Sequence, residues 1–176
     1  MAPGHWWRAI VRNAWPRRGA REGRYGPNCA SKSPRVHSFV YATREDAAFE
    51  ALLGLLNDAN RAWAADAGAL VALFSKRTLE HNGEEAATRS FDTGAAWQNF
   101  ALEATRRGLA VHPMAGFDWG SIHDALDVPA EEFDVEEMVA VGERADPEIL
   151  PEELQEREQP SDRKSLDELT FRGSFD

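Results

Sequence analysis

The pattern of apolar and polar residues becomes regular about a fifth of the way along the chain and predicts a succession of short strands and helices. Phe49, Leu52 and Leu56 recur at steps of three and four residues, the spacing of one face of an amphipathic helix. Residues 69–74 are continuously apolar, as expected of a strand that is buried on both faces. The predicted strands are 39–42, 69–74, 109–111 and 135–141, and the predicted helices are 47–56, 60–67, 92–107 and 121–126.

The order of these elements indicates the fold class. The chain runs β-α-α-β, then a polar loop at 77–90, then α-β-α-β, and Asp92 or Thr93 is expected to cap the long helix. Few strands among several helices are typical of α+β proteins. We therefore predict an α+β sandwich in which helices flank a small mixed sheet.

The end of the chain is rich in proline and charge and predicts an extended C-terminal arm, residues 147–176. Helical stubs are expected at 151–157 and 165–169, where Ser165-Leu166-Asp167-Glu168 fits a capping box. The sequence therefore favours one domain, residues 38–176, that ends in this arm.

Net charge divides the chain into two parts. The 176 residues carry a net charge of −10, but residues 1–37 hold eight Lys or Arg against one Asp or Glu, a net of +7. Residues 38–176 hold twelve against twenty-nine, a net of −17. An acidic body repels a phosphate backbone, which argues against nucleic-acid binding. No apolar run approaches the ~20 residues that cross a bilayer, so no membrane partner is expected.

The basic segment, residues 1–37, is broken repeatedly by Pro and Gly and shows no sustained periodicity. We expect a poorly ordered tail, with a mitochondrial targeting peptide or an RNA-binding arm as the alternatives. This segment contains Cys29, the single cysteine of the chain, which has no second cysteine with which to form an internal disulfide. Such cysteine usage favours an intracellular protein, and we expect a cytoplasmic one.

Candidate chemistry is confined to one stretch of the sequence. Gly-rich phosphate loops, HExxH and GxSxG motifs are absent, and no two of the five histidines have the i,i+4 spacing of a metal site on a helix. Residues 112–118 are HPMAGFD and follow a predicted strand. Pro113 fixes one backbone angle, and Gly116 allows another chain segment or a flat ligand to come close. Plain strand-to-helix turns often contain such residues, so both interpretations stay open at this point.

Several ordered blocks of the sequence resemble flavin-dependent nitroreductases. They are LLNDANRAWAADAGALVALFSK at 55–76, SFDTGAAWQNFALEATRRGLAVHPMAGFD at 90–118 and PEELQEREQPSDRKSLDEL at 151–169. The resemblance implies an α+β sandwich that forms an intertwined homodimer with FMN bound at the interface. It further implies that NADH or NADPH reduces the flavin, which passes electrons to a small-molecule acceptor such as a nitro compound or a quinone. Because the flavin carries this chemistry, the resemblance implies no catalytic side chain.

The resemblance also implies six cofactor-binding residues. They are Asn60, Met114, Ala115, Gly116, Arg163 and Lys164. Asn60 falls where the family has an Asn that hydrogen-bonds the flavin or its ribityl chain, and the turn 114–116 falls where the backbone flanks the isoalloxazine ring. The basic pair falls where the arm reaches the FMN phosphate, and two adjacent cations in an acidic tail suit a phosphate. Without the resemblance, Asn60 could equally be a helix cap, and the basic pair a solvated couple of charges.

The sequence departs from the family before residue 38. Family members open with Arg-Arg-Ser-x-Arg, then a helix, then a Pro-Ser-Ser-x-Asn-x-Gln-Pro-Trp segment against the flavin. Here residues 17–21 resemble the first block, but too few residues separate them from Pro27 to form the helix, and residues 27–34 lack the ending of the second block. This break favours a truncated or frame-shifted gene start. The second hypothesis is therefore a non-catalytic remnant or acidic interaction protein that retains the fold but not the flavin.

Overall fold

The computed structural model describes residues 37–146, 148, 152–155 and 162–175. By its internal contacts the chain divides into two compact units, with the boundary at Arg144 in the sequence. Residues 1–36, which include Cys29 and almost the whole basic segment, lie outside the described residues. None of the described helices has the length and apolar content that crossing a membrane requires.

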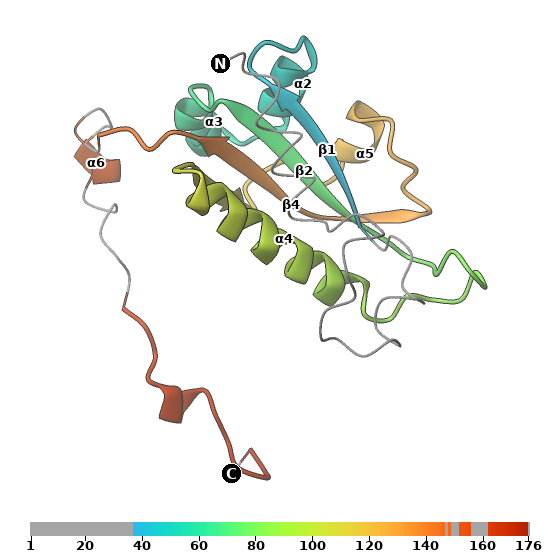
Figure 1. The fold of residues 1–176 in the computed structure, drawn as a ribbon. Coiled ribbons are helices and arrows are strands. Elements are labelled where there is room, and N and C mark those ends of the chain that lie inside the picture. Colours follow the sequence, from blue (N-terminus) through green and yellow to red (C-terminus); the bar gives the residue numbers. More distant parts are fainter. Residues whose placement is uncertain (1–36, 147, 149–151, 156–161, 176) are drawn as a thin grey trace. The chain divides into compact units, whose positions relative to one another are not determined.

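Four strands of the first unit form one sheet in the order β1-β2-β4-β3. Their bounds are β1 (His37–Thr43), β2 (Ala69–Lys76), β3 (Ala110–Met114) and β4 (Phe133–Gly142). All three pairings between these described strands are antiparallel. The expectation of a mixed sheet is therefore wrong, although β2 and β3 do run in the same direction. Strand β4 lies between them, beside β2 in Figure 1, so the two never pair.

Helices cover both faces of the sheet (Figure 1). One face carries α2 (Ala48–Leu55), α3 (Asp58–Ala64) and α5 (Ile122–Ala125), and the other carries α4 (Arg89–Arg106). Because successive side chains of a strand point to opposite faces, β2 contributes to two cores. Leu70 and Phe74 join the core beneath α2 and α3, and Val71 and Leu73 join the core beneath α4. The arrangement confirms the α+β sandwich and the strand buried on both faces.

The long helix begins earlier than its sequence pattern predicts, and the predicted caps, Asp92 and Thr93, are wrong. Helix α4 starts at Arg89, because Thr88 Oγ1 donates to Asp92 Oδ2 at 2.9 Å and brings the polar residues before Asp92 into the first turn. Thr93 is buried inside the helix, where its hydroxyl donates to Arg89 O at 2.8 Å. Polar residues at a helix start bond to one another as readily as to free backbone N–H groups, which blurs the boundary.

Strand β3 is also longer than expected, since it continues to Met114 instead of ending at Val111. It includes Pro113, which has no N–H to donate to a neighbouring strand. An edge strand tolerates a residue without an N–H, because one of its two sides has no neighbouring strand to pair with, and β3 stands at the edge of the described sheet. The HPM part of the HPMAGFD stretch therefore belongs to the strand, and only its remainder forms the turn.

The second unit contains the described part of the C-terminal arm. It includes the short helix α6 (Glu152–Gln155) and the 3-10 helix η2 (Leu166–Glu168). The backbone N–H and the hydroxyl of Ser165 each donate to Glu168 Oε2 at 2.9 Å, which confirms the predicted capping box. Arg163 and Lys164 are exposed just before this cap.

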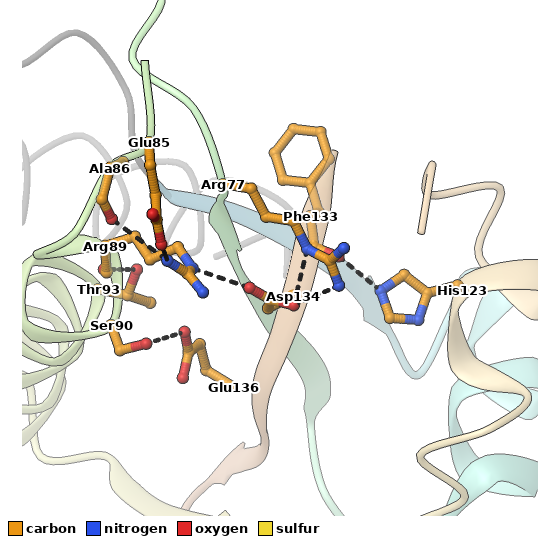
Figure 2. A network of polar contacts seen from close by, with 10 residues as sticks. All are labelled: Arg77, Glu85, Ala86, Arg89, Ser90, Thr93, His123, Phe133, Asp134 and Glu136. Carbon is orange, nitrogen blue, oxygen red and sulfur yellow. Dashed lines mark hydrogen bonds and ion pairs between the residues drawn. The ribbon is translucent and has the colours of Figure 1, made fainter. Parts of the chain in front are cut away.

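An ion-pair network attaches the loop after β2 and the start of α4 to β4 (Figure 2). Asp134, near the start of β4, accepts from Arg77 at Oδ1, with Nη2 at 2.6 Å and Nε at 2.9 Å. Its Oδ2 accepts from Arg89 Nε at 2.8 Å. Arg77 directly follows β2, and the loop also closes on itself where Ala86 N–H donates to Arg77 O at 2.8 Å. One carboxylate therefore connects three segments of the chain.

The network makes part of the stability depend on pH. Burial by itself would raise the pKa of Asp134, but the hydrogen bonds and positive charges of Arg77 and Arg89 outweigh it and lower this pKa below its ordinary value. A carboxyl group whose folded-state pKa is lowered stabilises the fold above its unfolded-state pKa. That contribution is lost as the pH falls through the folded-state value.

Replacing Asp134 with Asn should lower the free energy of unfolding by about 1–2 kcal/mol at pH 7, because the charged hydrogen bonds to two guanidinium groups are weakened. The estimate is modest since the Asp134 side chain is 30% exposed. Urea unfolding of wild type and Asp134→Asn should show a difference that shrinks as the pH falls below about 4.

Asp66→Asn is the matched control for this experiment. Asp66 pairs with Arg44 at 2.8 Å, but its side chain is 85% exposed, so its loss should change stability by less than about 0.5 kcal/mol. The account of the network would be contradicted if Asp134→Asn lowered the free energy of unfolding by no more than Asp66→Asn does. It would also be contradicted if the effect of Asp134→Asn were the same at pH 7 and pH 3.

Candidate functional site

Two turns that are far apart in the sequence pair with each other in the first unit. Leu56, between α2 and α3, forms an isolated antiparallel bridge with Phe117, which follows β3. The hydrogen bonds of this pairing are Asn57 N–H to Gly116 O at 3.0 Å and Asp118 N–H to Leu55 O at 2.8 Å. We call residues 55–60 and 114–118 the Gly116 junction. It joins the helices on one face of the sheet to the end of the edge strand.

Asn60 completes the junction with its side chain. Its Nδ2 donates to Gly116 O at 3.1 Å, so this carbonyl accepts one bond from Asn57 N–H and a second from Asn60. The alternative that Asn60 is a helix cap is wrong. Asn57 is the cap of α3, because its Oδ1 accepts from Asn60 N–H at 2.9 Å. The structure therefore brings Asn60 together with the turn 114–116.

Gly116 must be a glycine for these contacts to form. A Cβ built at Gly116 would lie 2.6 Å from Asn60 Nδ2 and closer still to Asn57 Nδ2. Contacts of this length do not occur, so any larger residue would displace one or both amides. The close approach expected at this position is confirmed, and the approaching segment belongs to the same chain.

The other two residues of the turn face opposite ways. Met114 is buried in the core beneath α2 and α3, whereas Ala115 is exposed. Ala115 O accepts from Phe117 N–H and from Trp119 Nε1, each at 3.1 Å. The Trp119 ring also stacks on Phe117 with centroids 4.3 Å apart, yet it remains 48% exposed. The surface at this turn therefore consists of backbone, one methyl group and one half-exposed indole.

Asp118 orders the segment that leads from the junction into α5. Its Oδ1 accepts from Gly120 N–H at 3.0 Å and from Ser121 N–H at 3.1 Å, and its Oδ2 accepts from the Ser121 hydroxyl at 2.6 Å. These bonds, that of the Ser121 hydroxyl most of all, lower the pKa of Asp118. The carboxylate therefore stays ionised at neutral pH and organises the turn.

The sequence alone predicts no role for Asn57 or Arg61, yet Asn57 belongs to the junction and Arg61 donates to it. The signal for Asn57 was an Asn before an acidic first turn, which is typical of a helix N-cap. Arg61 lies one turn later on α3, and its Nη2 donates to Leu56 O at 2.9 Å while it pairs with Asp58 at 3.3 Å. Nothing in the local sequence indicates the Arg61 contact, because it depends on how α2 and α3 are joined.

The sequence model of the Nitroreductase family matches residues 28–143. The chain belongs to the nitroreductase family. The match begins before residue 38, so it includes the last part of the basic segment. A Mycolicibacterium smegmatis protein, the "Uncharacterized 15.4 kDa protein in ask 5'region", is 33% identical over 144 residues, covering 76% of this chain and 88% of that protein.

Solved structures share the fold of this chain. A crystal structure described as "the oxidoreductase containing FMN" has a TM-score of 0.79 and 33% identity, and the likeness covers 96% of this chain and 80% of that chain. A putative nitroreductase in complex with FMN from Exiguobacterium sibiricum 255-15 has a TM-score of 0.69 and covers 98% of this chain and 87% of that chain. At 12% identity, the second likeness shows the fold alone.

Four of the six expected cofactor-binding residues meet at the Gly116 junction. They are Asn60, Met114, Ala115 and Gly116. The other two, Arg163 and Lys164, belong to the second unit. In the described part of the chain, no group of three or more His, Cys, Asp or Glu side chains could hold a metal ion.

Gly116→Ala should lower the free energy of unfolding by about 1–3 kcal/mol, because the new methyl group displaces the Asn60 amide that holds the junction. Gly54→Ala in α2 is the matched control, since a Cβ there meets nothing within 4 Å. It should leave stability unchanged or raise it by up to about 1 kcal/mol. Urea unfolding measures both, and a Gly116→Ala protein as stable as wild type would show that the amides do not hold the turn.

Proposed function

We propose that this chain is an FMN-dependent oxidoreductase that passes electrons from NADH or NADPH to nitroaromatic or quinone-type acceptors. Its family, and the 33% identity to a structure described as an oxidoreductase containing FMN, support this proposal. The observation that carries it is the Gly116 junction. Asn60 and the turn 114–116, which the family resemblance assigns to the flavin, are held together there by a direct hydrogen bond.

The junction fits the ring end of FMN in its donor and acceptor chemistry. The edge of an isoalloxazine ring carries carbonyl oxygens and ring nitrogens, which pair with amides and backbone N–H groups. The junction offers the carboxamides of Asn57 and Asn60 and the exposed backbone beside Ala115, and its acidic residues are Asp58 and Asp118. When bound there, FMN would supply the electron-transfer chemistry, which amide and hydrocarbon side chains lack.

The role of the protein's own residues would be to bind FMN and to orient it. Asn60 would hold the turn 114–116 in place and can direct its second amide N–H to the ligand. Asp118, already held by Gly120 and Ser121, would keep the turn rigid rather than exchange protons. The groups that we propose face the flavin are neutral amides and backbone, which suits a cofactor that changes charge during turnover because they do not strongly favour one charge state.

We place the phosphate of FMN at Arg163 and Lys164. The described part of the arm around them carries acidic residues, among them Asp162 and Asp167, so the adjacent cations are not explained by a generally basic surface. A guanidinium group can form paired hydrogen bonds to phosphate, and an ammonium group adds a point charge.

We also propose that the protein is a homodimer. Helix α4 covers one face of the sheet but leaves Phe91 78% and Leu102 61% exposed on its outer side. Exposed apolar residues of this size on one helix are typical of a surface that a partner covers. The occupant that the family resemblance favours is a second copy of this chain, with FMN at the interface.

The experiment on the cofactor is a fluorescence titration of the purified protein with FMN and with riboflavin, which lacks the phosphate. The double variant Arg163→Ala, Lys164→Ala should weaken FMN binding by about 2–4 kcal/mol, because charged hydrogen bonds to phosphate are lost. Riboflavin binding should be unchanged, and Arg172→Ala, an exposed cation of the same unit, should leave both unchanged.

Two results of this titration would contradict the proposal in different ways. If the double variant keeps the wild-type affinity for FMN, the phosphate assignment is wrong. If the wild-type protein binds neither flavin, the chain is a remnant that retains the fold but not the cofactor.

The electron donor is tested by adding NADH or NADPH to the FMN-loaded protein without oxygen. The visible flavin absorption band should disappear, because the flavin is reduced, and should return when a quinone or a nitroaromatic compound is added. Free FMN at the same concentration is the control. If neither nicotinamide bleaches the band faster than in the control, the proposed donor is wrong.

A further inference from the structure

Asn57 makes hydrogen bonds through three of its four polar groups. Its backbone N–H donates to Gly116 O at 3.0 Å, and its backbone O accepts from Arg61 N–H at 2.8 Å. Its side-chain Oδ1 accepts from Asn60 N–H at 2.9 Å. The fourth group, Nδ2, has no acceptor among residues 37–146. Asn57 is also exposed, so this amide can be reached from solvent.

The orientation of this amide is fixed by the helix cap. Oxygen and nitrogen of a carboxamide are distinguished only by their hydrogen bonds. Here Oδ1 must face the start of α3, because it accepts from Asn60 N–H, so Nδ2 must point the other way. That direction is toward Gly116, since Asn57 Nδ2 is the atom that a Cβ at Gly116 would meet first. Asn57 Nδ2 is therefore a donor of fixed orientation that lies beside the backbone of Gly116.

Asn60 differs from Asn57 in the use of its amide. Asn60 Nδ2 donates to Gly116 O at 3.1 Å and is partly buried. Its amide therefore already serves to hold the junction. Both asparagines lie beside Gly116, but they differ in their amide contacts. Asn60 Nδ2 donates to the backbone of the junction, whereas Asn57 Nδ2 has no acceptor among residues 37–146.

We infer that Asn57 is a further ligand-binding residue of this site, whose Nδ2 donates to an oxygen of the bound flavin. The inference rests on the proposed function. The acceptor is a carbonyl oxygen of the flavin ring or a hydroxyl oxygen of the ribityl chain, since both offer a lone pair to an amide. Helix capping does not explain why residue 57 is Asn. Ser and Asp are equally good N-cap residues, and neither carries an NH₂ group.

The experiment compares Asn57→Ser and Asn57→Asp with wild type. Both replacements retain a side-chain oxygen for the cap of α3, so the urea midpoint of the flavin-free protein should stay close to wild type. Asn57→Ser removes the NH₂ group and should raise the Kd for FMN by about 3- to 10-fold. Asn57→Asp should raise it further, because it places a negative charge against an acceptor oxygen.

Lumiflavin, which consists of the ring without the ribityl chain, identifies the acceptor. If the acceptor is a ring carbonyl, Asn57→Ser weakens lumiflavin and FMN by the same factor. If it is a ribityl hydroxyl, lumiflavin binding is unchanged while riboflavin and FMN are weakened. Asn60→Ser should behave differently from either Asn57 variant, lowering both the urea midpoint and the affinity, since it releases Gly116 O.

The outcomes separate this inference from the proposed function. Wild-type protein that binds FMN, together with an Asn57→Ser variant of equal affinity, overturns the role of Asn57 and leaves the proposed function standing. Wild-type protein that binds no flavin overturns both. An Asn57→Ser variant with a much lower urea midpoint would assign Asn57 to stability and also overturn the inference.

Discussion

The doubly bonded carbonyl of Gly116 is the interaction on which the arrangement of the site depends. It accepts from Asn57 N–H and from Asn60 Nδ2, and so fixes the end of β3 to the start of α3. A side chain at residue 116 would displace the side-chain amides of Asn57 and Asn60, and with the second of these the bond from Asn60 Nδ2. Without them the turn 114–116 would be held only at its two ends, by the buried side chains of Met114 and Phe117 and by the bond from Asp118 N–H to Leu55 O. The position of the exposed backbone, where we propose the flavin ring lies, follows from this one group.

The first unit uses a different kind of interaction at the loop between β2 and α4. There, Asp134 connects β4, the loop and α4 through the charges of Arg77 and Arg89. Charged pairs are strong when partly shielded from water, but they depend on pH and salt. The Gly116 junction is built mainly from neutral amides and backbone, which hold their geometry across the pH range. The flavin that we propose binds there gains and loses electrons, and surroundings that are mainly neutral do not strongly favour one of its charge states.

The sequence predicted the order of the elements because strong local patterns mark most of them. The apolar run 69–74 appears as a strand buried on both faces, and the stripe from Phe49 to Leu56 appears as α2. Two element boundaries were predicted wrongly. The start of α4 depends on contacts between polar side chains, as at Asp92, and the end of β3 depends on its position at the sheet edge, where Pro113 is tolerated. Local sequence does not contain this information.

The candidate site was predictable only in part, for the same reason. Gly116 and its turn stand out as a glycine after a strand, and the family resemblance indicated Asn60. The contact between them joins residues 56 positions apart, so only the folded chain shows it. The separate roles of Asn57 and Asn60 depend on which of them caps α3, and two asparagines so close together in the sequence are equally plausible caps.

The most direct test of the central claim is a two-dimensional nitrogen–proton NMR titration of the labelled protein with FMN. It reports the side-chain amides of Asn57 and Asn60 and the backbone N–H of Gly116 separately. If the flavin is seated at the Gly116 junction, these three signals shift together and yield one common Kd. FMN binding that shifts signals elsewhere and leaves these three unchanged would contradict the account.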